Sequence, residues 1–155
     1  MIIIYTTPSC SSCRKAKKWL DDHLIKYTER NLFTQSLTQD DIDYMLVNAE
    51  NGFDDIISTR SKVFKEQSLD IEDMRISELK EFIIENPSVL KRPIIVDDNR
   101  LQVGYNEEEI RVFIPRRLRE LIMRSTQAPG SDLEYKDAFD QYIREMKELE
   151  SKENE

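Results

Sequence analysis

The chain's two cysteines lie three residues apart near its start, in the segment Cys10-Ser11-Ser12-Cys13. A cysteine thiolate attacks disulfides and peroxides, and two cysteines at this spacing can close a disulfide across one turn. Because the segment opens a predicted helix, the helix N-terminus favours the thiolate, and cations between Arg14 and Lys18 add positive charge. We therefore expect a redox pair in which Cys10 is the outer, attacking thiol and Cys13 the inner, resolving one.

Two other interpretations of the cysteines remain open. A structural zinc site needs about four ligands, and the chain has no third cysteine and a single histidine, His23. Two unreactive core thiols would make no use of their position between a strand and a helix. Both interpretations fit less well than redox chemistry, so we predict neither a metal nor a cofactor.

Composition and charge limit the compartment and the partners. No stretch approaches the ~18 consecutive apolar residues of a membrane helix, and the short apolar start lacks the basic residues of a signal peptide. We therefore expect a cytoplasmic protein with no membrane contact. The net charge of −8 argues against a protein that grips DNA by itself, since phosphate contacts supply most of the affinity of such proteins.

The residues around the cysteine pair predict an α/β fold. Short apolar runs rich in β-branched residues are typical of strands, and strand signals of this kind occur at 2–6, 93–96 and 101–103, while the more polar 26–30 is a plausible further strand. Between the first two, Cys13, Ala16 and Leu20 share one face of a helix expected over 11–22. The start of the chain is therefore predicted to be a strand, a redox loop, a helix and a second strand.

The middle of the chain predicts helices instead. Thr38 can cap a helix whose first turn is acidic, and Asn51-Gly52 can end it, because both residues tolerate a left-handed backbone. Further helices are expected over 54–64, 70–85 and 107–114. We therefore predict a redox domain made of two segments, 1–33 and 87–124, which a helical insertion over 34–86 separates.

Residues beyond 124 extend past that domain. The segment 125–130 contains Pro129 and Gly130 and predicts a linker, and 131–155 predicts an acidic helical tail with nine acidic and four basic residues. Tyr135 begins a series of apolar residues at alternating spacings of four and three, which is typical of a helix seam. We expect the seam to dock transiently on the chain's own domain rather than to pair with another copy or to stay disordered.

Several motifs resemble those of the Spx regulators. They cover about residues 1–124 and are more specific than a pair of cysteines alone. The matching segments are Tyr5-Thr6-Thr7-Pro8-Ser9-Cys10-Ser11-Ser12-Cys13-Arg14-Lys15-Ala16, Glu29-Arg30-Asn31, Ile56-Ile57-Ser58-Thr59-Arg60-Ser61-Lys62, Arg92-Pro93-Ile94-Ile95 and Arg100-Leu101-Gln102-Val103-Gly104-Tyr105-Asn106. That family belongs to the arsenate-reductase-like branch of the thioredoxin fold, so the resemblance implies the same α/β fold here.

The resemblance also implies a function. It implies a regulator that senses disulfide stress at Cys10 and Cys13, binds the C-terminal domain of the RNA polymerase α subunit and redirects transcription. Promoter DNA would be contacted only through the polymerase, and a Clp protease would turn the protein over. The alternative is a thiol-disulfide oxidoreductase, either arsenate-reductase-like or a general disulfide exchanger.

Two arginines and a proline are candidates for supporting the redox pair. Thioredoxin-like folds usually place a cis-proline opposite the redox loop, and Pro93 at a strand start fits this position. Arg92 would then lie beside Cys10 and stabilise a thiolate by a charge-assisted bond, unless it is an ordinary surface arginine. Arg60 and Arg92 match two arginines with which arsenate reductases hold the oxyanion, but Val103 stands where a third is expected. The incomplete set favours a sensor over an enzyme.

Gly52 is the candidate polymerase contact. It matches the glycine through which Spx proteins contact the polymerase, and a residue without Cβ lets another backbone approach closely. The same glycine is equally suited to ending a helix. Some Spx proteins carry a basic residue in the preceding helix, where this chain has Val47. The basic stretch from Arg111 to Arg124 is interpreted as a solvated helix face rather than as a contact with promoter DNA.

Overall fold

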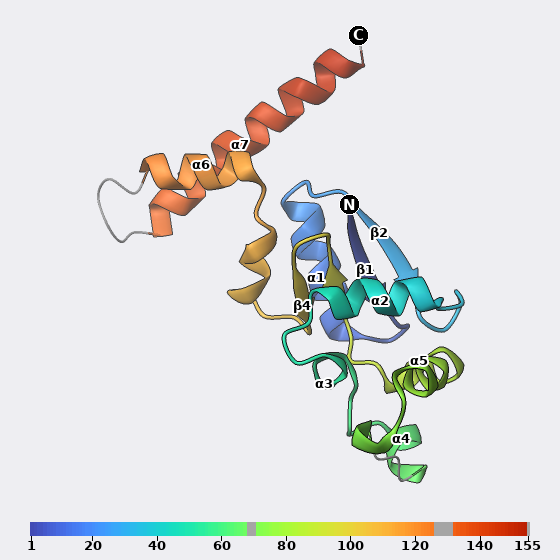
Figure 1. The fold of residues 1–155 in the computed structure, drawn as a ribbon. Helices are drawn as coiled ribbons and strands as arrows, with labels where there is room; N and C mark the ends of the chain where they lie inside the picture. Colours follow the sequence, from blue (N-terminus) through green and yellow to red (C-terminus); the bar gives the residue numbers. More distant parts are fainter. Residues whose placement is uncertain (68–70, 126–131, 155) are drawn as a thin grey trace.

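The computed structural model describes residues 1–67, 71–125 and 132–154 of the 155-residue chain. Its centre is a four-stranded sheet in the order β2-β1-β3-β4 (Figure 1). The strands are β1 Ile2–Thr6, β2 Tyr27–Asn31, β3 Ile94–Val96 and β4 Leu101–Val103. β2 is parallel to β1, whereas β3 is antiparallel to both β1 and β4. The predicted strands and the hairpin formed by the last two are confirmed.

The strands bury side chains on both faces of the sheet, because successive residues of a strand point to opposite sides. On one face, Tyr5 and Ile94 join a hydrophobic core with helices from the middle of the chain. On the other face, Ile4 and Ile95 pack against α1, which spans Ser11–Asp22. β1 is thus covered on both sides, which explains its nearly continuous apolar sequence.

The described residues between 34 and 86 form mainly helices, as predicted, but the single helix expected over 70–85 is a short 3₁₀ helix followed by a separate α-helix. Their elements are α2 Gln39–Val47, α3 Phe53–Ile56, α4 Lys62–Glu66, the 3₁₀ helix η1 Ile71–Asp73 and α5 Ile76–Glu85, followed by the 3₁₀ helix η2 Pro87–Val89. Thr38 caps α2 in a reciprocal pair of hydrogen bonds with Asp41. The cap that the sequence predicts is therefore present.

The end of α2 differs from the prediction. The helix stops at Val47 and is capped by Asn48, several residues before the expected terminator. Gly52 instead precedes the first residue of α3, with φ 60° and ψ −134°. The glycine therefore allows a sharp entry into the next helix rather than an exit from the previous one.

The single helix expected over 54–64 is divided into α3 and α4. Ile57 is extended between them and pairs with Leu90 in an isolated antiparallel bridge. Ser61 then caps α4 by accepting a hydrogen bond from the backbone N–H of Phe64 at 3.1 Å. Pairing with a residue far along the chain overrides the local helical pattern here.

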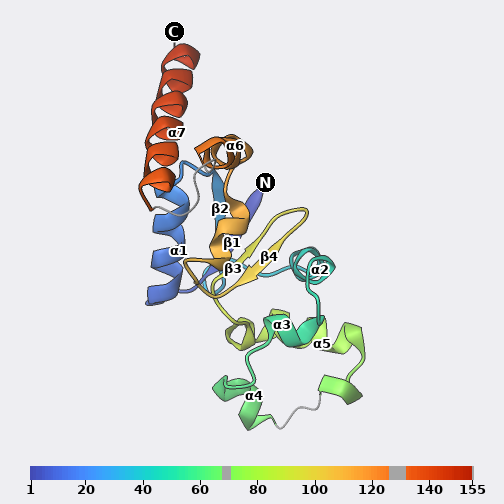
Figure 2. The same ribbon diagram turned by 90° about the vertical axis from the view of Figure 1, so that its left-hand side faces the viewer.

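The C-terminal part consists of the 3₁₀ helix η3 (Glu109–Phe113), α6 (Arg116–Ser125) and α7 (Asp132–Glu153). α7 lies against α6 and against the end of α1, and its C-terminal part projects away from the sheet (Figures 1 and 2). The tail thus docks on the chain's own domain, as expected, and the transient character of this docking stays a prediction. The expected linker falls almost entirely in 126–131, outside the described residues.

Candidate functional site

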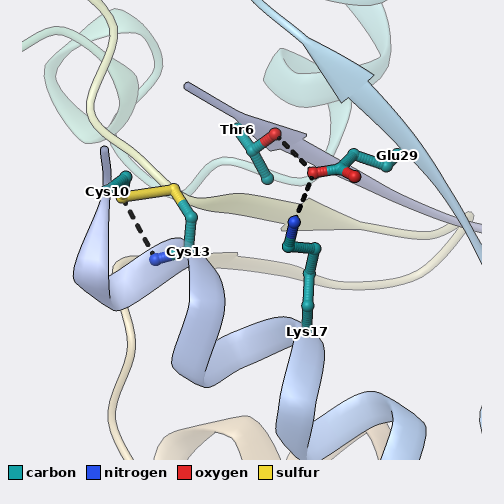
Figure 3. The surroundings of a disulfide bond; sticks show 5 residues. All are labelled: Thr6, Cys10, Cys13, Lys17 and Glu29. Atoms are coloured by element: carbon teal, nitrogen blue, oxygen red, sulfur yellow. Dashed lines mark hydrogen bonds and ion pairs between the residues drawn. A yellow bond between two sulfur atoms is a disulfide. The ribbon is translucent and has the colours of Figure 1, made fainter. Parts of the chain in front are cut away.

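The redox loop lies between β1 and α1 and carries a disulfide between Cys10 and Cys13 (Figure 3). The Cα atoms of the two cysteines are 5.2 Å apart, a separation typical of bonded pairs. Cys10 is the N-cap of α1, and its Sγ accepts a hydrogen bond from the backbone N–H of Cys13 at 3.1 Å. The helix N-terminus therefore supplies a hydrogen bond to the Cys10 sulfur, as the sequence predicts.

The two sulfurs differ in exposure. Cys13 is 2% exposed, whereas Cys10 is only partly buried. Arg14 and Lys15 are exposed on the first turn and leave the mouth of the loop positively charged. An external thiol or oxidant therefore reaches Cys10 first, in agreement with the expected order of attacking and resolving thiols.

A polar cluster that the sequence did not indicate lies next to Cys13. Lys17, one turn further along α1, forms an ion pair with Glu29 of β2 at 2.9 Å (Figure 3). The same carboxylate accepts a hydrogen bond from the hydroxyl of Thr6 at 2.8 Å. Desolvation raises the pKa of Glu29, but the hydrogen bonds from Lys17 and Thr6 outweigh it and bring the pKa below its ordinary value. The hollow at the disulfide is lined by all of these residues, so the redox pair faces a fixed ionic pair.

The predicted supporting residues lie directly before β3, in the case of Arg92 and Pro93, and shortly before α4, in the case of Arg60. The peptide bond between Arg92 and Pro93 is cis, as expected for the proline. The Arg92 guanidinium donates to the carbonyl of Ser88 at 3.5 Å and lies 5.8 Å from the ring centre of Phe33. Arg60 is exposed and shares a polar hollow with Arg92, separate from the one that Cys10 lines. The structure thus brings the two arginines together, and their support of the redox pair stays a prediction.

Gly52 lies on an open surface between α2 and α3. A Cβ placed on it meets no atom within 4 Å, so a larger side chain would project into solvent. Val47, at the end of α2, is 79% exposed. Asn51 fixes the intervening turn because its backbone N–H donates to the carboxylate of Asp55 at 2.9 Å. The predicted contact residue is therefore accessible and sits in a well-defined turn.

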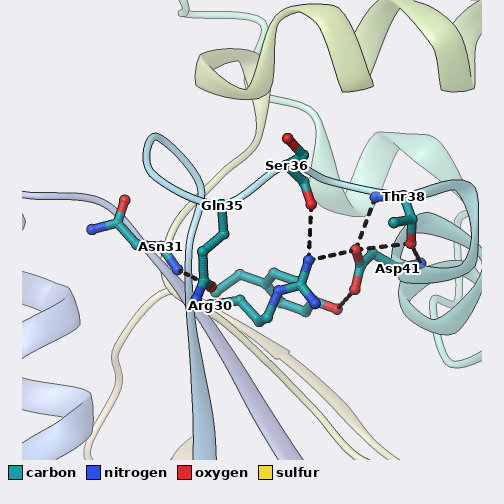
Figure 4. Close-up of polar contacts among 7 residues, drawn as sticks. Arg30, Asn31, Gln35, Ser36, Thr38 and Asp41 are labelled. Carbon is teal, nitrogen blue, oxygen red and sulfur yellow. Dashed lines mark hydrogen bonds and ion pairs between the residues drawn. The ribbon is translucent and has the colours of Figure 1, made fainter.

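A buried polar network holds the start of α2 to the sheet (Figure 4). Asp41 is 8% exposed and accepts hydrogen bonds from the hydroxyl of Tyr5 at 2.8 Å and from the guanidinium of Arg30 at 3.1 Å. Arg30 also donates to the carbonyl of Ser36 at 2.9 Å. Burial and the bond to Asp41 raise the pKa of Tyr5, which keeps the phenol protonated. Sequence analysis found the cap of α2 but not this link to β1 and β2.

Among the described residues, no group of three or more His, Cys, Asp or Glu side chains could hold a metal ion. No helix within the same residues is both long and apolar enough to cross a membrane.

A mixed four-stranded sheet with a disulfide at the first turn of α1 and a cis-proline before β3 defines a redox-active protein of the thioredoxin fold. Solved structures share this fold. An ArsC family related protein from Bacteroides fragilis is 28% identical, with a TM-score of 0.61 over 70% of this chain and 92% of that one. An arsenate reductase from Vibrio cholerae is 20% identical, with a TM-score of 0.62 over 74% of this chain and 97% of that one.

Sequence comparisons give the family. Residues 5–113 match the model of the ArsC family. The global transcriptional regulator Spx of Bacillus subtilis is 50% identical over 127 residues, which are 82% of this chain and 97% of that protein. Its counterpart from Listeria innocua is 51% identical with the same coverage. The chain therefore belongs to the ArsC family and, within it, to the Spx regulators.

The comparisons confirm the resemblance and the fold class that the motifs predict. The relatives of about 50% identity are named as transcriptional regulators rather than as enzymes, which agrees with the expected regulator. Nearly the whole of each relative is matched, yet part of this chain is not. This chain therefore carries residues that those relatives lack.

Proposed function

We propose that the chain is a redox-responsive transcription regulator that binds the C-terminal domain of the RNA polymerase α subunit. The observation that carries the proposal is the Cys10–Cys13 disulfide at the start of α1, in a chain about half identical to Spx regulators. The bond would form under disulfide stress and open in a reducing cytoplasm. The protein acts by binding polymerase, and promoter DNA is contacted only through that complex.

The geometry of the redox loop supports a reversible switch. Cys10 is partly accessible and receives a hydrogen bond from the first turn of α1, which stabilises a thiolate there. Cys13 is buried directly behind it and can displace any group that Cys10 has taken up. Attack by Cys13 on a mixed disulfide at Cys10 forms the Cys10–Cys13 bond and releases the external thiol.

The surface around Gly52 supports the polymerase contact. The turn that carries Gly52 is fixed by Asn51 and Asp55, and no side chain covers the glycine. A partner backbone can therefore approach closely at this point. Exposed Val47 adds an apolar contact where some Spx proteins offer a cation, so the α subunit interface here is less dependent on charge.

The decisive experiment measures binding of the purified α C-terminal domain by calorimetry, with the chain reduced by dithiothreitol or oxidised by diamide. Gly52→Arg is expected to weaken binding by about tenfold or more, because a bulky cation blocks close approach. Gly52→Ala is the matched control, since both variants lose the glycine's freedom at φ 60° but alanine adds little bulk. Binding in neither redox state would refute the polymerase partner, and equal binding of both states would refute redox control.

The alternative function is a thiol-dependent reductase. Arg60 and Arg92 share one hollow, as an oxyanion clamp requires, but Val103 stands in place of a third arginine and Cys10 does not line that hollow. We therefore expect no multiple turnover of arsenate with glutaredoxin or thioredoxin as the thiol donor. Sustained turnover of arsenate would favour the reductase function over the regulator function.

The remaining parts of the proposal concern turnover and organisation. A Clp protease is proposed to degrade the protein in the cytoplasm. The division into a redox domain (1–33 and 87–124), an insertion (34–86) and a tail (131–155) is also proposed. Limited proteolysis tests it, because cleavage between 125 and 131 should leave the redox domain with an intact disulfide.

A further inference from the structure

The tail helix α7 covers a surface made by α1 and α6. The cluster at this interface includes Ile114, Leu118 and Leu121 from the region of α6 and Ala138 and Tyr142 from α7, all buried. α7 lies beyond the part of the chain that resembles Spx proteins, and the matched relatives are too short to account for the whole of this chain. The covered surface is therefore a feature in which this chain departs from them.

His23, the chain's only histidine, lies at the centre of this interface. It follows the last residue of α1 and is 7% exposed. Its ring stacks on Trp19 with ring centres 3.9 Å apart, and Phe139 of α7 lies at 5.0 Å on a tilted plane. Its Nδ1 is 2.7 Å from the carbonyl oxygen of Trp19, and its Nε2 is 2.9 Å from the hydroxyl of Tyr135 on α7.

These contacts fix the tautomer of the neutral ring. A carbonyl oxygen only accepts hydrogen bonds, so Nδ1 of His23 carries the hydrogen and donates it to Trp19. In the neutral ring, Nε2 then accepts the hydroxyl hydrogen of Tyr135. A second proton on Nε2 would require the Tyr135 hydroxyl to turn and accept instead, and it would place a positive charge in a site that is closed to water. The docked helix is therefore built for neutral His23.

The surrounding charges do not offset this preference. Burial lowers the pKa of His23 below its ordinary 6.5, and its bond to Trp19 and the charge of Asp22 oppose that shift only in part. Arg111 of η3 lies 5.5 Å from the ring centre of Tyr135 and disfavours a further cation. Asp21 of α1 and Lys147 of α7 line the adjacent apolar hollow with opposite charges.

A second polar contact of α7 is insensitive to mild acid. Arg117 of α6 binds Glu145 of α7 through two hydrogen bonds of 2.7 and 2.8 Å. The hydrogen bond from Arg117 is the main cause that lowers the pKa of Glu145 to about 2. This ion pair therefore stays intact from neutral pH down to pH 5, the range in which a histidine titrates.

We propose that α7 is a pH-sensitive latch: protonation of His23 weakens the docking of the helix on α1, while the Arg117–Glu145 pair still holds the helix to α6. Above the pKa of free histidine, His23 is neutral in both states and α7 docks with full strength. As the pH falls below 6.5, the released state takes up a proton more readily than the docked state. The docking equilibrium constant then falls by about tenfold for each pH unit that separates the two pKa values.

The full-length protein carries its own reporter, because Trp19 is the only tryptophan and stacks directly on His23. Hydrogen exchange of residues 132–153 and Trp19 fluorescence would be measured at pH 7.5 and 5.5. We expect protection of α7, corrected for intrinsic exchange rates, to fall severalfold at pH 5.5, while β1 and β3 stay protected. Equal protection of α7 at both pH values would overturn the proposal.

Two variants separate the latch from general acid sensitivity. His23→Gln keeps a hydrogen-bonding side chain without a titratable ring, so α7 protection should become independent of pH between 7.5 and 5.5. A pH response that survives in His23→Gln would refute the role of His23. If that variant fails to dock, an NMR titration of His23 in the unmodified protein decides, because a pKa at or above 6.5 would also refute the latch.

Discussion

The two ends of α1 carry different chemistry. At its first turn, Cys10 faces solvent, Cys13 lies behind it, and an ionic pair of Lys17 and Glu29 lines the hollow. At its last turn, about 18 Å away along the helix, His23 is enclosed by aromatic rings and by a helix more than a hundred residues distant in sequence. A covalent switch needs access to external thiols, whereas a latch made of weak contacts needs water to be excluded.

The largest effect is expected for a substitution at the N-terminal end of α1, and it should be confined to that end. Cys13→Ser removes the resolving thiol, so the internal disulfide is lost completely and Cys10 retains an added glutathione as a mixed disulfide. Mass spectrometry after oxidation with glutathione disulfide measures this directly. Ser12→Ala is the matched control and should close the internal bond normally. Loss of α7 protection in Cys13→Ser would show that the two ends are coupled.

The next largest effect is expected for a substitution at the contacts that hold α7 to the C-terminal end of α1. Tyr142 is 3% exposed, and its hydroxyl donates to the backbone carbonyl of His23 at 3.2 Å. Tyr142→Ala should cost about 3 kcal/mol of unfolding free energy, mainly through lost packing against α6. Denaturant unfolding measures the loss, and Tyr142→Phe should recover most of it. The rate of disulfide formation by diamide should be unchanged, and a slower rate would contradict the independence of the redox loop.

The smallest effects come from two carboxylates that pair with neighbouring lysines of α1. Glu29 pairs with Lys17 beside Cys13, and Asp22 pairs with Lys18 beside His23. Glu29→Gln should speed oxidation of the reduced pair by roughly two- to threefold at pH 7, because the unpaired Lys17 favours a thiolate. Asp22→Asn should leave that rate alone and lower the pKa of His23 instead. An effect of either variant at the opposite end would contradict the comparison.

The first end of α1 was largely predictable, because its signals are local. An apolar run before Cys10, the spacing to Cys13 and the cations that follow specify the strand, the loop and the helix. The cap at Thr38 was likewise predicted from adjacent residues, the cis-proline at position 93 was predicted from what thioredoxin-like folds usually contain, and both are present. The pairing of Lys17 with Glu29 was not, since it depends on how α1 packs over β2.

The contacts at the C-terminal end of α1 were predictable from the sequence only in outline. The seam of the tail indicated docking, but nothing near His23 in the sequence indicated a partner 112 residues away. Arg92 illustrates the same limit. Its position beside Phe33 depends on how two segments far apart in the sequence pack together, which no local pattern encodes. Side-chain contacts between distant segments require the fold before they can be assigned.

The bridge between Ile57 and Leu90 separates the segment between them from the sheet. The backbone N–H of Ser58 donates to the carbonyl of Val89 at 2.7 Å, and that of Lys91 donates to the carbonyl of Ile56 at 2.8 Å. These two hydrogen bonds hold together the two ends of the segment between Ser58 and Val89. Changes in the length of this closed segment alter its loop-closure entropy only slowly. They can affect the strands only through the two hydrogen bonds that close the segment. Changes within α4 should therefore leave the sheet and the cysteine pair in place.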